Sequence, residues 1–232
     1  MTEEAKRQPI EAPQEDFKEF LNQLLSLLPP KARDYVKRYS REILAGALAL
    51  VLGIILISGY SHYKESQESQ AATLMGQALY EKSPEKRISV LEEVIRDHGS
   101  TDAARLALNI IARAYYDQGA QEKALEYFKK AAQKAPDHTV VKQSALLGWG
   151  YCLEEKGDLG EALEKFDDAI KVSKGLEKIA LLDKARVAKG AGKADVALEA
   201  YNKVLSEAPS SGELDFVKFE ILELKRAEKK KD

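Results

Sequence analysis

The chain has 232 residues, of which 32% are charged and 7% aromatic, and a formal net charge of −2. This near-neutral balance gives no sign of the basic surface that a nucleic-acid-binding domain needs, so we expect no nucleic-acid partner. The single cysteine, Cys152, excludes an intramolecular disulfide and a zinc site built on cysteines, and we expect it to be buried in a helix. Ala, Leu, Glu and Lys dominate the C-terminal two thirds, so the composition predicts an all-α fold.

The first 42 residues form a polar N-terminal stub. Within it, apolar residues recur at helical spacing over 16–28 and predict a short amphipathic helix that ends at Pro29. The pattern leaves two roles open for this helix. It lies in the interface of a membrane, or it docks on a partner protein.

Residues 43–63, ILAGALALVLGIILISGYSHY, are the most apolar stretch of the chain. No charged residue occurs between Glu42 and Lys64. A helix of this length spans roughly 30 Å, the thickness of the hydrocarbon core of a bilayer. A buried helix of a soluble protein is seldom so long, and the segment lacks the cleavage site of a signal peptide. We therefore expect a single transmembrane helix over 43–63.

Basic residues on the N-terminal side predict the direction of this helix. They are Lys31, Arg33, Lys37, Arg38 and Arg41, whereas Lys64 is the only Lys or Arg in the stretch directly after the helix. Positive charge is enriched on the cytoplasmic side of membrane helices. The N-terminus is therefore expected in the cytoplasm and residues 64–232 on the far side, which in a bacterium is the periplasm.

Small residues recur every four positions within the apolar segment, at Ala45, Ala49 and Gly53. Such a stripe lets a second helix approach closely in a membrane. It predicts packing against a partner helix, although Ala and Gly are also common in membrane helices without one.

The region after residue 70 repeats itself in three units. Corresponding residues of the first and second units are 38 positions apart, and those of the third follow after 35 more. The units are Leu108, Ile111, Ala112, Tyr115, Gly119, Ala124, Phe128, Ala131 and Pro136; Leu146, Trp149, Gly150, Leu153, Gly157, Ala162, Phe166 and Ala169; and Leu181, Lys184, Ala185, Ala188, Gly192, Ala197, Tyr201, Val204 and Pro209.

Each repeated position has a physical role in a pair of antiparallel helices. A bulky residue beside a small one, as in Trp149–Gly150, lets the second helix pack closely on the first. The glycines Gly119, Gly157 and Gly192 permit the tight turn between the two helices. Small alanines and large aromatics then alternate where the helices come nearest.

Further signals mark the ends of the helices. Asp158, followed by Glu161, predicts an N-cap, and the prolines Pro136 and Pro209 are expected to close their units. Lys184 and Lys174 depart from the pattern, because one replaces an apolar residue and the other a closing proline.

The repeat region extends in both directions. Upstream, 74–80 and 88–95 predict a degenerate helix pair of the same kind. Downstream, 214–227 predicts a helix that caps the array and is charged on one face.

This spacing of small and large residues resembles the tetratricopeptide repeat (TPR) over about residues 70–230. The resemblance implies a TPR-like α-solenoid of antiparallel helix pairs that binds peptides or partner domains along the concave surface of the first helices. The groove positions of the family fall on Asn109, Arg113, Tyr116, Leu147, Tyr151, Glu154, Leu182 and Arg186. The alternative is that several of these are ordinary solvated residues. The positions that hold a C-terminal carboxylate in some members lack the required residues here; they are Asn109, Arg113, Gly148, Ile179 and Asp183.

No motif for catalysis is found in the sequence. His62, His98 and His138 lie far apart, and no Gly-rich phosphate loop or GxSxG motif is present. We therefore expect no enzymatic activity, no cofactor and no metal site.

A cytoplasmic stub, one membrane helix and a periplasmic TPR-like domain together resemble the bacterial family of ancillary SecYEG translocon subunits (YfgM-type). That resemblance implies a protein of the bacterial inner membrane that associates with the SecYEG secretion channel and with periplasmic chaperones and handles exported proteins. Two alternatives stay open: a structural scaffold for envelope assembly or cell division, and an assembly factor for a membrane-bound redox complex.

Overall fold

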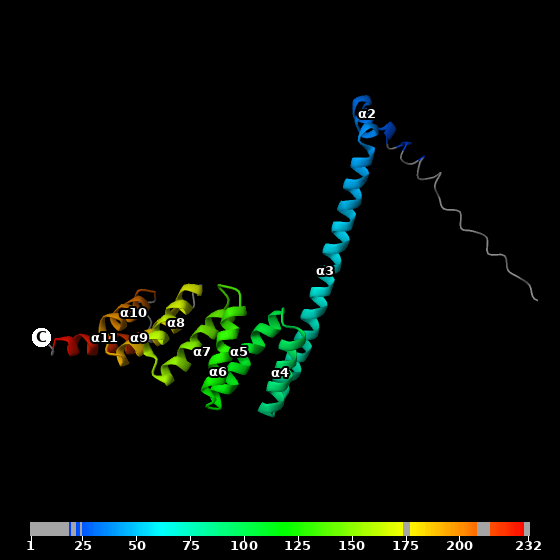
Figure 1. Cartoon of the computed structure of the whole chain (residues 1–232). Helices are drawn as coiled ribbons and strands as arrows, with labels where there is room; N and C mark the ends of the chain where they lie inside the picture. The colour runs from blue at the N-terminus through cyan, green and yellow to red at the C-terminus, as the bar shows by residue number, and fades with distance from the viewer. Residues whose placement is uncertain (1–18, 20–21, 24, 174–176, 208–213, 230–232) are drawn as a thin grey trace, which may run out of the picture. The chain divides into compact units, whose positions relative to one another are not determined.

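A computed structural model describes residues 19, 22–23, 25–173, 177–207 and 214–229. The described residues lie in helices and in the turns between them, and no strand occurs among them. The chain divides into two units, Met1–Tyr63 and Lys64–Asp232. One long helix, α3 (Ser40–Tyr80), contributes to both units (Figure 1).

In the first unit, α2 (Pro30–Arg38) precedes α3. Pro30 occupies the first turn of α2, where the missing N–H of proline leaves no helical hydrogen bond unmade. This helix was not predicted from the sequence, because its basic residues were interpreted only as the flank of the apolar segment. Of the amphipathic helix expected over 16–28, residues 16–18, 20–21 and 24 lie outside the described residues. The described residues 19, 22–23 and 25–26 are helical, and the helical pattern stops before Pro29, as expected.

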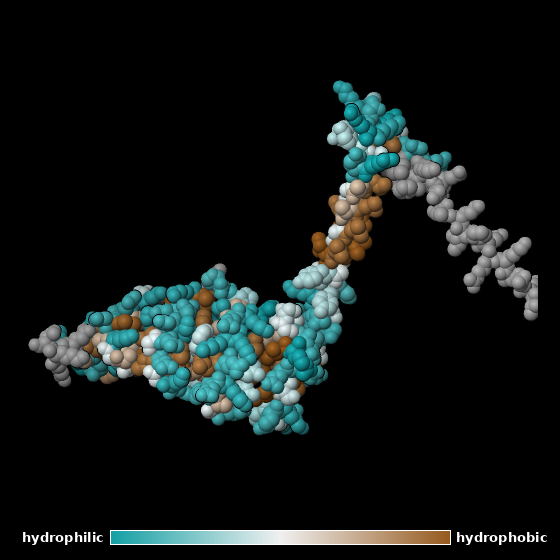
Figure 2. Space-filling view, in the orientation of Figure 1, coloured by the Kyte–Doolittle hydropathy of each residue, from teal (hydrophilic) through white to brown (hydrophobic). Residues whose placement is uncertain are grey.

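The apolar segment forms one uninterrupted part of α3. Figure 2 shows apolar residues gathered in a band along this helix. Among the residues described, α3 is the one helix long and apolar enough to cross a membrane, and the side chains of its apolar window are not buried in the protein. The small residues Ala45, Ala49 and Gly53 lie in this exposed part, and the stripe they form remains a prediction.

The second unit is an array of antiparallel helix pairs that begins with the C-terminal part of α3. The further helices are α4 (Pro84–Asp97), α5 (Asp102–Asp117), α6 (Gln121–Lys134), α7 (Val140–Lys156), α8 (Leu159–Val172), α9 (Glu177–Gly190), α10 (Ala194–Glu207) and α11 (Asp215–Glu228). They follow one another in chain order along this unit (Figure 1). The predicted all-α array of helix pairs is confirmed, including the upstream pair.

Tight turns join the two helices of the three predicted repeats. Gly119, Gly157 and Gly192 have φ angles of 73°, 88° and 73°. These values lie in the left-handed region, which costs glycine little and strains other residues. The predicted role of the three glycines is confirmed.

The core of the array lies where small residues face aromatic ones. Ala124, Ala162 and Ala197 are fully buried. A Cβ atom on Gly150 would lie 2.6 Å from the ring of Phe166, so only glycine allows α7 and α8 to pack this closely. The expected close contact beside Trp149 is therefore confirmed at Gly150.

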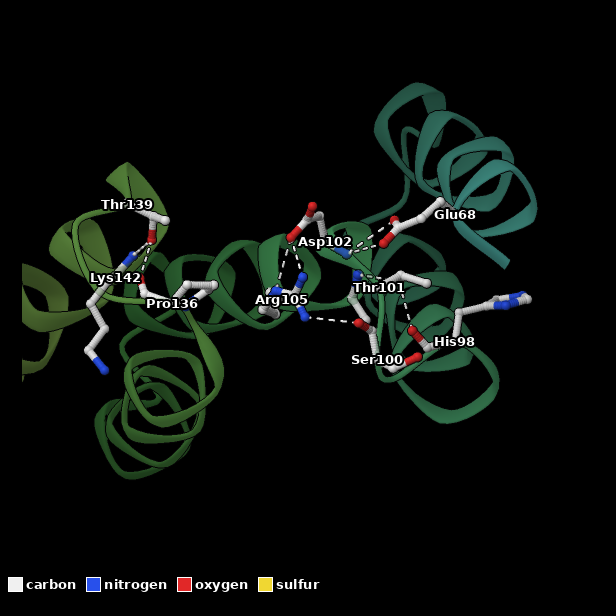
Figure 3. A network of polar contacts seen from close by, with 10 residues as sticks. Glu68, His98, Ser100, Thr101, Asp102, Arg105, Pro136, Thr139 and Lys142 are labelled. Atoms are coloured by element: carbon white, nitrogen blue, oxygen red, sulfur yellow. Dashed lines mark hydrogen bonds and ion pairs between the residues drawn. The ribbon is translucent and has the colours of Figure 1, made fainter. Parts of the chain in front are cut away.

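Threonine side chains begin two of the first helices in the same way (Figure 3). Thr101 Oγ1 accepts a hydrogen bond from Ala104 N at 3.1 Å, and Thr139 Oγ1 accepts one from Lys142 N at 3.2 Å. These caps satisfy backbone N–H groups that have no partner within their helix. At α5 the carboxylate of Glu68 adds a contact from α3, because both of its oxygens lie 3.1 Å from Asp102 N.

Three sequence predictions need correction or fall outside the described chain. Asp158 precedes α8, but its side chain does not cap the helix; its carboxylate lies 3.5 Å from Lys156 Nζ instead. Pro136 follows α6 as expected, whereas Pro209 and Lys174 lie outside the described residues.

The third repeat keeps its packing despite Lys184. This largely buried side chain donates a hydrogen bond to the carboxylate of Asp167 on α8 at 2.6 Å. A buried ammonium group is tolerated when a carboxylate pairs with it. The Lys184–Asp167 pair therefore replaces the apolar contact of the other repeats.

The capping helix α11 differs from the prediction on one face. It buries Val217, Ile221 and Leu224 against the array, as a cap should. Its outward face is not simply charged, because Phe219 and Leu222 are exposed on it. The sequence predicted a charged face because charged residues surround these two in the chain.

Candidate partner-binding groove

Polar side chains connect the first helix of each pair to the first helix of the next. Each contact links residues about one repeat apart. Asn109 binds Val141 O and Ser144 Oγ; Tyr116 donates to Glu155; Tyr151 donates to Asp183; Arg186 donates to Glu154; and Lys189 donates to Glu220. These contacts join α5 to α7, α7 to α9 and α9 to α11, so they form a ladder along the first helices.

The part of this ladder that joins α7 to α9 contains its bidentate ion pair. Arg186 is bidentate on Glu154, with Nη2 at 2.9 Å from Oε2, and also lies 3.2 Å from Asp183. The hydrogen bond to Glu154 raises the pKa of Arg186, which stays charged. Bidentate pairs between a guanidinium and a carboxylate fix geometry as well as charge. The α7–α9 junction is therefore closed by side chains of the chain itself.

The junction between α5 and α7 is open by comparison. A groove of about 460 Å³ lies here. Its walls include the apolar side chains of Leu106, Ile110 and Leu147 and the rings of Tyr116 and Tyr151. Pockets that bind ligands or peptides commonly combine such apolar walls with a few polar groups.

Gly148 shapes the floor of this groove. A Cβ atom there would lie 2.3 Å from the ring of Phe128, which also lines the groove. Any larger residue at 148 would displace the ring, so glycine keeps the aromatic surface at the floor. From the sequence, position 148 was noted only because its glycine cannot bind a C-terminal carboxylate, as some other TPR proteins do at this position.

Two arginines line the same groove. Arg113 Nε lies 2.9 Å from Asp117 Oδ1, and its guanidinium group lies 5.5 Å from the centre of the Tyr116 ring. Both members of this ion pair are more than half exposed, so the pair holds the arginine weakly. Arg87 Nη2 donates to Glu81 O at 2.7 Å.

The two tyrosine hydroxyls in the groove remain protonated donors at neutral pH. Burial, followed by the hydrogen bond to Glu155, raises the pKa of Tyr116 to about 12. Burial and the hydrogen bond to Asp183 raise the pKa of Tyr151 as well. Their hydroxyls are used within the ladder, so a partner would meet mainly their rings.

The structure divides the eight predicted groove residues among three places. The residues that line the 460 Å³ groove are Asn109, Arg113, Tyr116, Leu147 and Tyr151. Leu182 and Arg186 line a second groove of about 280 Å³ beside α11, together with Phe216. Glu154 binds Arg186 and belongs to the ladder.

Three residues that line the groove were not predicted from the sequence: Leu106, Ile110 and Phe128. Leu106 and Ile110 lie on the same face of α5 as Asn109 and Arg113, so helical spacing could have found them. Phe128 was assigned only to the core. It is only 4% exposed, so it does belong to the core, and it also lines the groove beside Gly148, which has no side chain.

Metal-binding and reactive groups are sparse in this part of the chain. Among the described residues, no group of three or more His, Cys, Asp or Glu side chains could hold a metal ion. Cys152 is buried, and burial raises the pKa of its thiol to about 11. The buried ring of His98 lies with Nδ1 2.6 Å from Gln67 Oε1 on α3.

A family model described as a tetratricopeptide repeat-like domain matches residues 33–226. The chain belongs to this family. Repeats of this kind generally mediate contacts between proteins and are typically non-catalytic, which agrees with a groove built of apolar and aromatic walls. No curated protein matches the chain significantly.

Solved structures with the same fold support the assignment. A Podosopora anserina protein described as a kinesin light chain with nearly identical TPR-like repeats is 14% identical, with a TM-score of 0.53 over 72% of this chain and 86% of that chain. A tetratricopeptide repeat protein from Parabacteroides merdae is 12% identical, with a TM-score of 0.54 over 71% of this chain and 60% of that chain. MamA from Desulfovibrio magneticus RS-1 is 17% identical, with a TM-score of 0.50 over 71% and 92% of the two chains. At these identities the likeness is one of fold.

Proposed function

We propose that this TPR protein is anchored by α3 in a bacterial inner membrane and binds partner proteins on the periplasmic side. The apolar side chains along α3 are exposed, as those of a membrane helix are, and basic residues precede them. The family model also begins at residue 33, before this helix, so the helix belongs to the matched region.

The observation that carries the binding function is the groove between α5 and α7. It offers an apolar surface of about 460 Å³ between two helices that the ladder holds in place. Because the groove exists without a partner, little conformational entropy is lost when one binds. Arg87 and Arg113 add positive charge for the polar part of a ligand.

We further propose that the partners are proteins of the export pathway: the SecYEG channel, its chaperones and the chains that emerge from it. The anchor would keep the groove near the channel exit and so raise its effective concentration there. No covalent step is required. This assignment depends on the resemblance of the whole architecture to ancillary translocon subunits.

Site-specific photo-crosslinking in living cells tests both parts of the proposal. A crosslinker replaces Leu106 in the groove, and a matched one replaces Val140, an exposed residue that is not part of the groove. Crosslinks to many exported chains and to channel subunits from 106, but not from 140, support the proposal. A single constant partner would favour the scaffold for envelope assembly or cell division.

The choice of groove variants follows from the ladder. Tyr151→Asp would place a second carboxylate beside Asp183 and disturb the α7–α9 junction as well as the groove. Leu106→Gln combined with Arg113→Gln changes two exposed residues of the groove, and Val140→Gln is the control. Leu106 also lines a second groove of about 460 Å³ beside α3, so Arg113→Gln alone is compared with the double variant. We expect the groove variant to lose at least about tenfold in partner affinity, the loss of a few weak apolar and charged contacts. Unchanged affinity would rule the groove out.

A further inference from the structure

The capping helix α11 exposes three large apolar side chains. Phe216, Phe219 and Leu222 are 60%, 55% and 55% exposed. Large apolar side chains that gather on one exposed face mark a surface for contact with another protein. An exposed face with two phenylalanines therefore needs a partner.

Four residues form a straight stripe along the centre of this exposed face. Asp215, Phe219, Leu222 and Arg226 follow one another at intervals of four, three and four residues. This alternation of three and four is the spacing of a coiled-coil seam, in which one stripe of a helix meets the same stripe of another helix. We name these four residues the α11 seam. The side chains of Asp215 and Arg226 at its two ends are 76% and 72% exposed.

The α11 seam is complementary to itself when it is reversed. Phe219 and Leu222 are equally far from its middle, and so are Asp215 and Arg226. In an antiparallel pair, each phenylalanine would lie opposite a leucine and each aspartate opposite an arginine. A parallel pair would instead place Asp215 against Asp215. Interfaces between identical subunits related by a twofold axis require this kind of self-complementarity.

We propose that α11 is an interface between two copies of this chain, with the two α11 helices packed antiparallel along the α11 seam. Asp215 and Arg226 now form weak ion pairs within their own helix, to Lys218 and Glu223, at 3.0 Å each. Such exposed pairs exchange partners at little cost. The opposed helix dipoles also favour the antiparallel arrangement.

The interface is small, and the expected affinity follows from its size. One helix pair of this length buries less surface than a standard stable interface, so the dimer is weak in solution. Two copies confined to one membrane would meet at a much higher effective concentration. Phe216 borders the α11 seam and also lines the 280 Å³ groove, so the second copy would lie beside the C-terminal end of the binding surface.

Charge reversal in the full chain in lipid nanodiscs or detergent tests the orientation. Asp215→Arg and Arg226→Asp each place like charges opposite one another twice in the dimer. Each should weaken self-association about tenfold, the effect of turning two exposed attractions into repulsions. A mixture of the two variants should recover association to within about threefold of the original, because both contacts are then attractive in the mixed pair. If the mixture associates no better than the separate variants, the proposal is wrong.

A disulfide test locates the contact independently. In a Cys152→Ala chain, Phe219→Cys mixed with Leu222→Cys should form a disulfide between copies under mild oxidation. Lys203→Cys, at an exposed position on α10, is the control and should form at least about tenfold less, since random encounters lack the held geometry. Equal yields from 203 and from the α11 seam would overturn the proposal.

Two further measurements keep the tests specific. Circular dichroism of each variant confirms that helicity is kept. The charge series is repeated with Ala49→Leu, which removes the small-residue stripe of α3, so that association through α3 does not conceal the effect of α11. Failure of the α11 tests leaves the groove function untouched, because the crosslinks from residue 106 are read separately.

Discussion

The α5–α7 and α7–α9 junctions are built from the same repeat and yet differ in what they can do. At α5–α7 the glycine at 148 and apolar residues leave a groove of about 460 Å³. At α7–α9 a bidentate pair of Arg186 and Glu154 and the Tyr151–Asp183 hydrogen bond occupy the equivalent surface. The same repeat position is therefore accessible at one junction and occupied by an ion pair at the next, depending on which side chains the neighbouring helix presents.

A substitution in the core beneath the α7–α9 junction should give the largest loss of stability. Phe166 is fully buried between α7 and α8. Phe166→Ala is expected to lower the free energy of unfolding by about 3–5 kcal/mol, because it removes a large apolar side chain and leaves a cavity. Denaturant unfolding of the purified chain measures this. The control Phe216→Ala, at an exposed position, should change stability by less than about 0.5 kcal/mol.

The floor of the open junction gives the next largest effect. Gly148→Ala places a Cβ atom 2.3 Å from the ring of Phe128, so the ring must move. We expect a loss of about 1–3 kcal/mol, the usual range for overpacking, together with weaker partner binding.

Gly160 on α8 is the matched control for that substitution. A Cβ atom added at Gly160 would have no atom within 4 Å. Because Gly160 lies in the first turn of α8, Gly160→Ala should stabilise the chain by at most about 0.5 kcal/mol, less than in the middle of a helix. Thermal unfolding compares the two variants. A neutral or stabilising Gly148→Ala would show that the floor is not tightly packed.

Removing one charged contact from each junction should give smaller changes in stability. Glu154→Gln leaves Arg186 with Asp183 alone and is expected to cost about 1 kcal/mol, as for a partly exposed charged hydrogen bond. Arg113→Gln in the open groove removes an exposed ion pair and should cost at most about 0.5 kcal/mol. Urea midpoints of both variants decide the order. Equal costs would contradict the distinction between a closed and an open junction.

Ionisation of the groove tyrosines should leave the stability of the chain unchanged at neutral pH and lower it in alkali. Because the pKa of Tyr116 is raised to about 12, its hydroxyl in the folded chain ionises later than in the unfolded chain. Its contribution to stability is present below the unfolded value near 10 and is lost as the pH rises through about 12. Ultraviolet titration should show a late ionisation step near pH 12. Tyr116→Phe should reduce its amplitude without removing it, because the pKa values of Tyr127 and Tyr151 are raised as well.

Much of the fold could be predicted because it depends on local patterns. The turn glycines, the buried alanines and the helix pairs all follow from spacing along the chain. The misses have physical causes. The helix α2 was not predicted, because its basic residues were interpreted as the flank of the apolar segment. Asp158 does not cap α8, because its carboxylate lies beside Lys156 instead.

The candidate site could be predicted only in part. Helical periodicity selects the face of each first helix, and two residues selected in this way, Asn109 and Leu147, line one groove. Their role in partner binding stays a prediction. It does not reveal what the next helix offers. Arg186 and Glu154 have suitable positions for a groove. However, the two residues, 32 positions apart in the chain, bind each other across the α7–α9 junction.

The sequence by itself determined the apolar helix, the repeat and the class of fold, because length, hydropathy and periodic spacing act locally. Only the tertiary structure decided which part of the repeat surface is open. That depends on distances between residues one repeat apart: the ring of Phe128 against Gly148, and the carboxylate of Glu154 against Arg186. Close packing and charge pairing across helices are set by three-dimensional contact, which spacing along one helix does not contain.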